Sequence, residues 1–223
     1  MVMDRPPAFL AELLLLADSA LPVGAFSHSF GLETLFAHRQ FGLGDPELIE
    51  RLSGRLWSEW GGVDGPAFSL AHQRANQGDV SWLTTLDRLV DAMRLPAEWR
   101  RAGRQMGRQL VRLDQSLVAL GAGAQAMGDG TARETLDAWA LAMYRGESPG
   151  QYAVAAGGVY AARGVPLPEA LAAFAMSSVV SAVTVAVRLV PLGQVEGQAL
   201  VRKLWARLVP AVERAASAQD VTA

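Results

Sequence analysis

Apolar residues recur at steps of three and four along almost the whole chain, the spacing of one face of an α-helix. The clearest run is Leu48, Leu52, Leu56 and Trp60. It follows Asp45 and Pro46, a capping carboxylate and a proline in the first turn. The alternation of apolar and polar residues that marks a strand is nearly absent. The pattern therefore predicts an all-α fold.

The most apolar stretch of the chain, residues 170–187, carries no charged residue. Pro168 is placed to begin a helix there, Pro191 to end it, and Gly193 to turn the chain into a last helix. About 18 such residues are the minimum for a membrane span, but this stretch is rich in Ala and Ser and lacks flanking aromatic anchors. We expect a buried central helix at about 168–190, with a membrane segment as the alternative.

Turn and capping signals divide the remainder into further helices. Gly61 and Gly62 are placed to end one helix, Ser148 and Pro149 to start another, and Pro210 to kink or restart the last. Thr131 and Glu134 have the spacing of a capping box. Gly157 and Gly158 lie inside a predicted helix, where each costs about 1 kcal/mol relative to alanine. Two adjacent glycines therefore indicate close contact with another helix.

These signals predict one domain over residues 1–223. It is a single-domain helical bundle of about nine or ten helices around the buried central helix. Its ends, at about 1–8 and 216–223, are expected to be flexible.

The composition excludes several classes of function. The formal net charge of -2 gives no general reason to bind nucleic acid. The absence of cysteine excludes disulfides and thiolate metal sites. His28, Glu33 and His38 follow at five-residue steps, on different helix faces, so they do not form a metal site. We expect no tightly bound cofactor.

No pattern in the chain predicts catalysis. There is no GxxxxGK[ST] loop and no GxGxxG after a strand. Ser27 and Ser29 flank His28, but no GxSxG elbow frames them, so they are expected to cap a helix or turn. The N-terminal leucine run is interrupted by Glu12 and lacks the pattern of a secretory signal. We expect a cytoplasmic protein that is not an enzyme.

A row of four arginines and the single residue Arg188 each have two interpretations. Arg100, Arg104, Arg108 and Arg112 line one helix face and form either a solvated surface or a docking stripe for an acidic partner. Arg188 ends the central helix, where the helix dipole stabilises a cation by about 0.3–1 kcal/mol. Alternatively, its planar guanidinium is presented to a carboxylate or phosphate of a partner. Gln194 and Gln198 either cap the backbone or contact that partner.

Four blocks of sequence together resemble the UreF family of urease accessory proteins. The first and last are LLLLADSALPVGAFSHSFGLE (13–33) and VAVRLVPLGQVEGQ (185–198). RRAGRQMGRQLVRL (100–113) and QYAVAAGGVYAARGV (151–165) resemble the blocks between them. The similarity extends from about residue 13 to about residue 208, with the four blocks in the family's order and spacing.

The resemblance implies an all-α cytoplasmic scaffold in urease maturation. Such a protein joins a second accessory protein, UreD (UreH in some organisms), and recruits the nickel-carrying GTPase UreG. The assembly delivers nickel to apo-urease, so the metal belongs to the partner complex. The family commonly forms homodimers, and its N-terminal and C-terminal segments tend to contact UreD. The alternative is that the chain regulates UreG as a GTPase-activating protein, with Arg188 or an arginine of the 100–112 stripe acting in trans.

The resemblance carries specific residues over to this chain as partner-binding or motif positions. These are Pro22, Gly24, Phe26, Ser27, Ser29, Gly31 and Glu33 in the first block, and Arg188, Pro191, Leu192, Gly193, Gln194, Gly197 and Gln198 in the last. His28 stands where the family usually has tyrosine, Ala25 where glycine is usual, and Glu196 in place of the more usual aspartate. The imidazole of His28 can still donate a hydrogen bond, but any contact that needs a phenol is in doubt.

Overall fold

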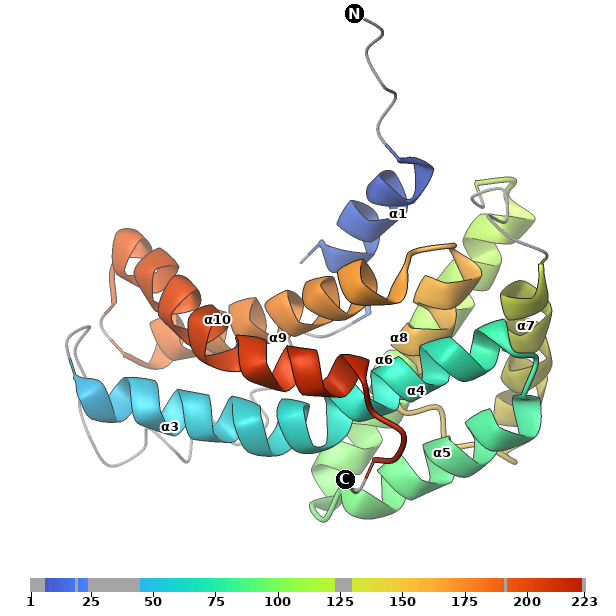
Figure 1. Ribbon diagram of the computed structural model, residues 1–223, viewed down its shortest axis with the longest axis horizontal. Helices are drawn as coiled ribbons and strands as arrows, with labels where there is room; N and C mark the ends of the chain where they lie inside the picture. The colour runs from blue at the N-terminus through green and yellow to red at the C-terminus, as the bar shows by residue number, and fades with distance from the viewer. Residues whose placement is uncertain (1–6, 19, 24–44, 123–129, 191, 222–223) are drawn as a thin grey trace, which may run out of the picture.

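The computed structural model describes residues 7–18, 20–23, 45–122, 130–190 and 192–221. These residues form helices and no strand, which confirms the all-α prediction. In chain order the helices are α1 (Ala8–Ala17), α3 (Pro46–Leu56), the π-helix η2 (Trp57–Asp64), α4 (Gly65–Asn76), α5 (Val80–Met93), α6 (Ala97–Ala119), α7 (Thr131–Tyr144), α8 (Tyr152–Ala162), α9 (Leu167–Leu189) and α10 (Gln194–Ala216). Figure 1 shows α4 to α8 gathered at one end of the molecule, with α3, α9 and α10 extending to the other.

The predicted central helix is present as α9, but its burial is one-sided. Phe174, Val179 and Val183 are buried, whereas most positions between them are half-exposed. The most completely buried helix is α8, of which every residue from Ala153 to Ala162 is buried. It packs against α4, α6 and α7. Because no charged residue occurs between Gln151 and Ala162, α8 can lie in the core without any buried charge of its own.

Gly157 sets how closely α8 approaches α4. A Cβ atom at this position would lie 2.4 Å from the carbonyl oxygen of Phe68 and 2.9 Å from the Cβ of Ala71. At Gly158 a Cβ atom would meet only a methyl group of Leu136, at 3.1 Å. The prediction that the glycine pair marks close helix contact is confirmed, and Gly157 carries most of it.

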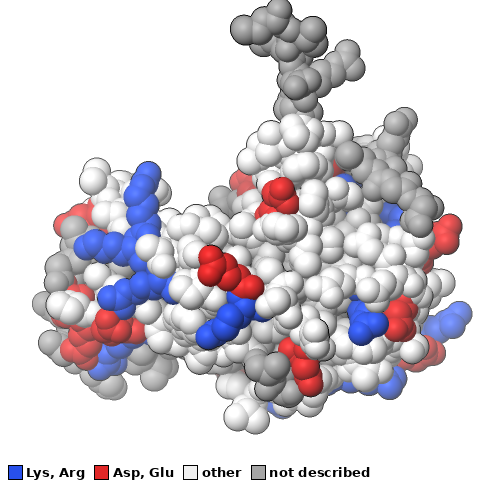
Figure 2. Space-filling model, in the orientation of Figure 1, with Lys and Arg blue, Asp and Glu red and all other residues white. Residues whose placement is uncertain are grey.

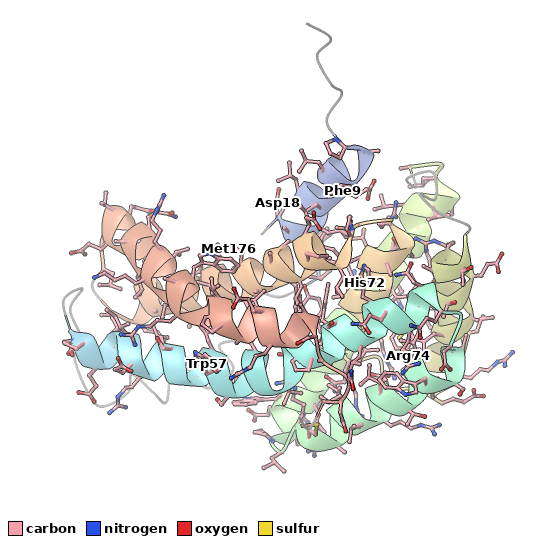
Figure 3. The ribbon with its side chains drawn as sticks, viewed as in Figure 1. Phe9, Asp18, Trp57, His72, Arg74 and Met176 are labelled. Carbon is pink, nitrogen blue, oxygen red and sulfur yellow. The ribbon has the colours of Figure 1, made fainter. Side chains whose placement is uncertain are left out.

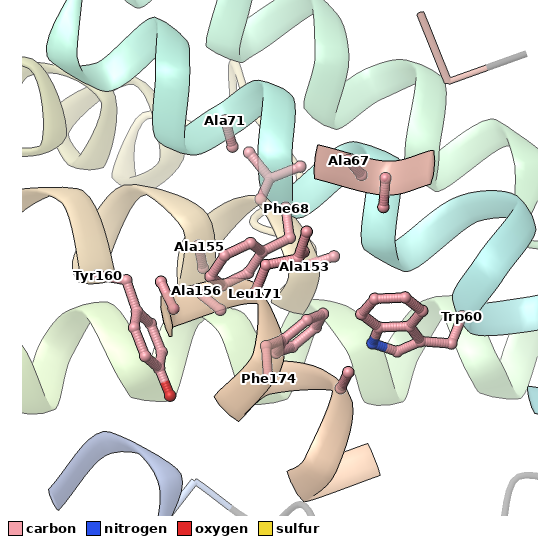
Figure 4. Close-up of a cluster of buried hydrophobic side chains, with 14 of the residues drawn as sticks. Trp60, Ala67, Phe68, Ala71, Ala153, Ala155, Ala156, Tyr160, Leu171 and Phe174 are labelled. Atoms are coloured by element: carbon pink, nitrogen blue, oxygen red, sulfur yellow. The ribbon is translucent and has the colours of Figure 1, made fainter. Parts of the chain in front are cut away.

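An aromatic cluster joins the two ends of the fold (Figure 4). Phe68 of α4 stacks on Phe174 of α9 with ring centroids 4.6 Å apart, and Tyr160 of α8 meets Phe68 edge-on at 5.4 Å. Trp60 of η2 lies against Phe174 at 6.2 Å. Offset and edge-on ring pairs of this kind stabilise a core beyond the area they bury.

The segment before α8 is fixed by a buried carboxylate. Asp87 of α5 accepts hydrogen bonds from Ser148 Oγ (2.5 Å), Gly150 N (2.6 Å) and Gln151 N (2.7 Å). Burial raises the pKa of Asp87, and the three donors oppose that rise. The expected helix start at Ser148 and Pro149 is therefore wrong, because these residues form an Asp87-bound turn and α8 begins at Tyr152.

Of three other predicted capping and breaking signals, one is present in the structure. Asp45 caps α3 as predicted, by accepting from Glu47 N at 2.9 Å. The capping box at Thr131 is wrong, because α7 begins after Gly130, which has a φ of 85° and makes no side-chain cap. The glycines at 61 and 62 do not end a helix, since the π-helix η2 carries the chain through them into α4.

Pro210 does not restart the last helix. It lies inside α10, which continues to Ala216. Proline removes one backbone donor and disturbs the carbonyls of the preceding turn. The indole nitrogen of Trp57 donates to the carbonyl of Arg207, in that turn, at 3.1 Å. The guanidinium of Arg214 lies over the same indole at 4.3 Å from the ring centroid. Contacts from η2 thus support the proline-containing turn.

The prediction of a single domain with flexible ends at about 1–8 and 216–223 stays a prediction. The buried apolar side chains of the described residues form a core cluster that includes Val23 and Val221. Val221, within the second of these ends, is 3% exposed.

Candidate functional site

The corner between α9 and α10 is anchored by two buried side chains. Val190 and Leu192 are 4% and 8% exposed, and Leu192 N donates to Val190 O at 2.7 Å. Pro191, between them, lies outside the described residues. Figure 1 shows this corner at the end of the molecule opposite α5 and α7. Leu192 is therefore an anchor of the corner rather than a surface residue.

The start of α10 is capped by Glu196. Its Oε2 atom accepts from Gly193 N at 2.7 Å, and Gly197 N donates to Gly193 O at 2.9 Å. A glutamate at the third helical position that reaches back to the N-cap nitrogen is one half of a capping box. The glutamate at this position thus has a structural role in the corner.

The two glycines of the corner have different roles. Gly193 has a φ of -73°, and a Cβ atom there would meet only Glu196 Oε2, at 3.5 Å. Alanine therefore fits at position 193. Gly197 is buried, and a Cβ atom added at this position would lie 3.2 Å from Val187 Cγ2. Gly197 therefore sets the close approach of α10 to α9.

The outer face of the corner is open. Arg188, Gln194 and Gln198 are exposed, as are Leu189 (41%) and Val195 (83%). The side chain of Arg188 makes no ion pair or hydrogen bond within the part of the chain that the structure describes. We call these five residues the corner patch.

Further cations lie near the corner patch on α10. Arg202 and Lys203 are exposed, roughly 12 Å along α10 from its first residue at 1.5 Å per residue. Figure 2 shows charged side chains of both signs gathered at this end of the molecule. The exposed Glu50 of α3 pairs with Arg207 at 2.6 Å. A surface of exposed guanidinium, amide and apolar groups offers contacts to another protein.

Most of the first block lies outside the described residues. This applies to Gly24, Phe26, Ser27, His28, Ser29, Gly31 and Glu33, so their predicted roles stay predictions. Pro22 is described, and it lies exposed in the turn that follows α1. Asp18 forms this turn by accepting from Ala20 N through its side chain at 2.8 Å and from Leu21 N through its carbonyl at 3.1 Å.

The turn with Pro22 lies against the middle of α9. Ser177 Oγ donates to Ala17 O at 3.2 Å, and a groove of about 260 Å³ is lined by Asp18 and Met176, among others. Figure 3 labels these two residues. Ser177 precedes Arg188 by eleven residues, or about 16 Å along the helix. The described part of the first block thus contacts α9 well away from Arg188, and it does not form one site with the corner patch.

Side-chain contacts within the protein involve three arginines of the predicted stripe. Arg104 binds Asp91 through two hydrogen bonds, at 2.6 and 2.5 Å, which hold the pKa of Asp91 below its usual value. Arg108 donates to Pro149 O at 3.0 Å, and Arg100 donates to the carbonyls of Arg94 and Leu95. These arginines connect α6 to its neighbours. The spacing alone could not show this, because the acceptors of Arg104 and Arg108 are 13 and 41 residues away in sequence.

Among the described residues, no three His, Asp or Glu side chains lie together as a metal site. Two features of the structure were not predicted from the sequence. Two ion pairs, Arg55–Glu59 and Arg94–Asp64, line a cavity beside η2. Leu14 and Leu15 of α1 are 64% and 61% exposed, and the four leucines that follow Glu12 were the available signal.

By length and composition, α9 is the one helix in the described ranges that is able to cross a membrane. Within its most apolar window, 44% of the residues are buried inside the protein. The buried side chains pack on α1, α4, α8 and α10. Packing in the core thus accounts for much of its apolar character.

Comparison with known proteins agrees with the four sequence blocks. The UreF family model matches residues 45–204, which include three of the four. The chain is 33% identical to the urease accessory protein UreF of Kocuria rhizophila, over 96% of this chain and 85% of the relative. It is 33% identical to that of Arthrobacter sp. strain FB24 (89% and 80%) and 29% identical to that of Haemophilus influenzae strain PittEE (95% and 84%). The chain belongs to the UreF family of urease accessory proteins.

Proposed function

We propose that this protein is a scaffold of the urease-maturation complex. Together with a UreD/UreH-type partner it recruits the nickel-carrying GTPase UreG and assists nickel insertion into apo-urease. The proposal includes a cytoplasmic location, a homodimeric assembly and no catalytic residue or tightly bound cofactor of its own. Nickel is cargo of the complex.

The observation that carries the proposal is the chain-wide similarity to urease accessory proteins, joined to an exposed corner. The similarity covers the corner residues, whose anchors Val190 and Leu192 are buried while Arg188 is exposed and unpaired in the described part of the chain. An arginine without a side-chain partner among the described residues can bind a carboxylate of another protein without first losing such a contact. This supports a partner-binding role for the corner patch.

Co-purification of the tagged protein with the UreD/UreH-type partner and UreG tests the proposal. We expect Arg188→Ala and Val195→Asp to reduce recovery of a partner and to reduce urease activation. Arg101→Ala is the matched control, because Arg101 is also an exposed helical arginine but lies on α6. If both corner variants assemble and activate urease as well as Arg101→Ala does, the corner is only structural.

A second candidate function is suggested by the same exposed arginine. Arg188 could act in trans on UreG as a GTPase-activating arginine, which in other GTPases raises the hydrolysis rate about 10³–10⁵-fold. GTP hydrolysis by UreG, measured with and without this protein, separates the two functions. Binding without stimulation, or equal stimulation by Arg188→Ala, excludes the activating role and leaves the scaffold.

The location is tested by fractionation. A scaffold of soluble partners is expected in the detergent-free soluble fraction, with α9 inside the fold. Recovery only after detergent extraction would instead support the alternative in which residues 170–187 span a membrane.

A further inference from the structure

Helix α1 packs against the protein along one side. None of its residues is buried, and its main neighbour is α9. Phe9, Leu13 and Leu16 are the partly buried residues that meet the core, whereas Leu14 and Leu15 face outward. Figure 1 shows α1 at the edge of the molecule, beside α9. The apolar area that holds α1 in place is therefore small, and polar contacts gain weight in its docking.

An ion pair joins α1 to the end of α8. Glu12 Oε2 lies 3.8 Å from Nη1 of Arg163, the residue that directly follows α8. Arg163 is 3% exposed, and its Nε atom donates to Asp114 of α6 at 2.6 Å. Because a buried guanidinium is stable only when its charge is paired, Arg163 attracts the Glu12 carboxylate toward the protein interior.

Asp114 is shared between two arginines. Its carboxylate also accepts from Arg133 of α7 at 2.6 Å, so one buried carboxylate serves two guanidiniums. Asp137 lies 3.7 Å from Arg133, but its side chain is 48% exposed and the attraction is screened by water. The Glu12 side chain is 18% exposed and supplies the second carboxylate at Arg163. Docking of α1 thus balances the charge of this buried cluster.

The other end of α1 is held by the hydrogen bond from Ser177 Oγ of α9 to Ala17 O. The helix between these two contacts has ten residues. Isolated helices shorter than about 12–15 residues are marginal in water, so α1 is expected to unfold when it leaves α9. Exchange of its amide protons therefore measures how often it is undocked.

Undocking of α1 would open the groove of about 260 Å³ beside it. Leu16 and Ala17 of α1 line this groove together with Ala173, Met176 and Val180 of α9. The three α9 residues are partly buried while α1 is docked. Release of α1 would add their apolar surface, and that of α1 itself, to the surface that solvent or another protein can reach.

We propose that α1 is a strap that docks and undocks as one unit, and that the Glu12–Arg163 ion pair sets how often it is undocked. Helices α4 to α8 stay folded during this opening, because local opening occurs where few apolar side chains are buried. The strap lies outside the corner patch, so the strap and the scaffold function can fail independently.

Amide hydrogen exchange of the ¹⁵N-labelled full-length protein, followed by NMR, tests the proposal. The amides of residues 13–16 report on α1, and those of residues 159–161 report on α8. We expect Glu12→Gln to lower the protection factors of the α1 amides by a common factor of roughly 3–30, between the values for exposed ion pairs and for hydrogen bonds to buried charges. The α8 protection factors should not change.

Two further variants sharpen the test. Glu213→Gln is the matched control, because it removes the same charge from an exposed position on α10. Ser177→Ala removes the hydrogen bond at the opposite end of α1 from the start of the helix. If α1 moves as one unit, Ser177→Ala should lower the protection of all four leucine amides by about 2–10-fold, and the double variant with Glu12→Gln should show the product of the two factors.

Three results would overturn the proposal. The first is a Glu12→Gln protein whose α1 protection factors equal those of Glu213→Gln, which would mean that the ion pair does not control docking. The second is an equal loss of protection in α1 and α8, which would mean that α1 opens only when the whole protein unfolds. The third is an effect of Ser177→Ala confined to the last turn of α1, which would show fraying in place of a strap.

Discussion

Replacing Gly157 by alanine is expected to separate α8 from α4. The added Cβ atom would lie 2.4 Å from Phe68 O and 2.9 Å from Ala71 Cβ. Restoring an ordinary contact requires a movement of about 1 Å, since carbon atoms pack best at roughly 3.5–4.0 Å. Both obstacles are rigid, because one is a backbone carbonyl and the other is a Cβ atom fixed to the backbone of α4.

The magnitude follows from two opposing effects. Overpacking of this kind costs about 1–3 kcal/mol, with rigid neighbours at the upper end, whereas alanine gains about 1 kcal/mol over glycine inside a helix. We expect Gly157→Ala to lower the free energy of unfolding by about 2 kcal/mol. Gly158→Ala makes the same helical gain and meets only the movable methyl of Leu136. We expect that variant to be neutral or more stable by up to about 1 kcal/mol.

Thermal unfolding followed by far-ultraviolet circular dichroism measures the difference between these adjacent substitutions. A gap of about 2–3 kcal/mol corresponds to roughly 4–12 °C in Tm for a chain of this length. Size-exclusion chromatography of both variants controls for aggregation. If Gly157→Ala unfolds at or above the temperature of Gly158→Ala, the close contact between α4 and α8 does not limit stability, and the steric argument is refuted.

Three further predictions concern side chains that hydrogen-bond to backbone groups. Burial lowers the pKa of His72, whose Nε2 atom is hydrogen-bonded to Val165 O at 2.8 Å. The unfolded chain takes up a proton near pH 6.5 that the folded protein resists, so the free energy of unfolding should fall as the pH drops below 6.5. His72→Gln should flatten that pH dependence in denaturant titrations. Asp87→Asn should lower the free energy of unfolding by about 1–3 kcal/mol for each buried donor left without an acceptor, and unchanged urea unfolding would contradict the Asp87 network. Trp57→Phe removes the donor to Arg207 O and should lower the free energy of unfolding by about 1 kcal/mol. Proteolysis should then increase in the second half of α10. An unchanged digestion pattern would show that the proline-containing turn needs no support from Trp57.

Features of the fold that depend on residues close together in the sequence could be predicted, and features that depend on residues far apart in the sequence could not. The helix around 168–190 and the Asp45 cap follow from local spacing and composition, and both are present. The Ser148 turn could not be predicted, because its partner Asp87 is 61 residues away in sequence. The π-helix η2 was missed for a related reason, since the glycines at 61 and 62 resemble a helix end unless the neighbouring helices are known.

The candidate site shows the same division. The VAVRLVPLGQVEGQ block located the corner, but only the tertiary structure separated its anchors from its exposed residues. Leu192 and Gly197 are buried against the protein, while Arg188, Gln194 and Gln198 are open to solvent. The arginines at 100–108 have similar spacing in the sequence, but Arg104 and Arg108 bind neighbouring elements of the protein.

The sequence by itself determined the all-α class, the position of α9 and the family, because helical periodicity, apolar composition and ordered motifs are properties of the chain. The tertiary structure decided that α8 rather than α9 is the fully buried helix, and that Arg104 and Arg108 bind neighbouring elements while Arg188 has no side-chain partner among the described residues. The physical reason is that burial and hydrogen-bond partnership depend on residues brought together from distant parts of the chain. Local sequence patterns do not contain that information.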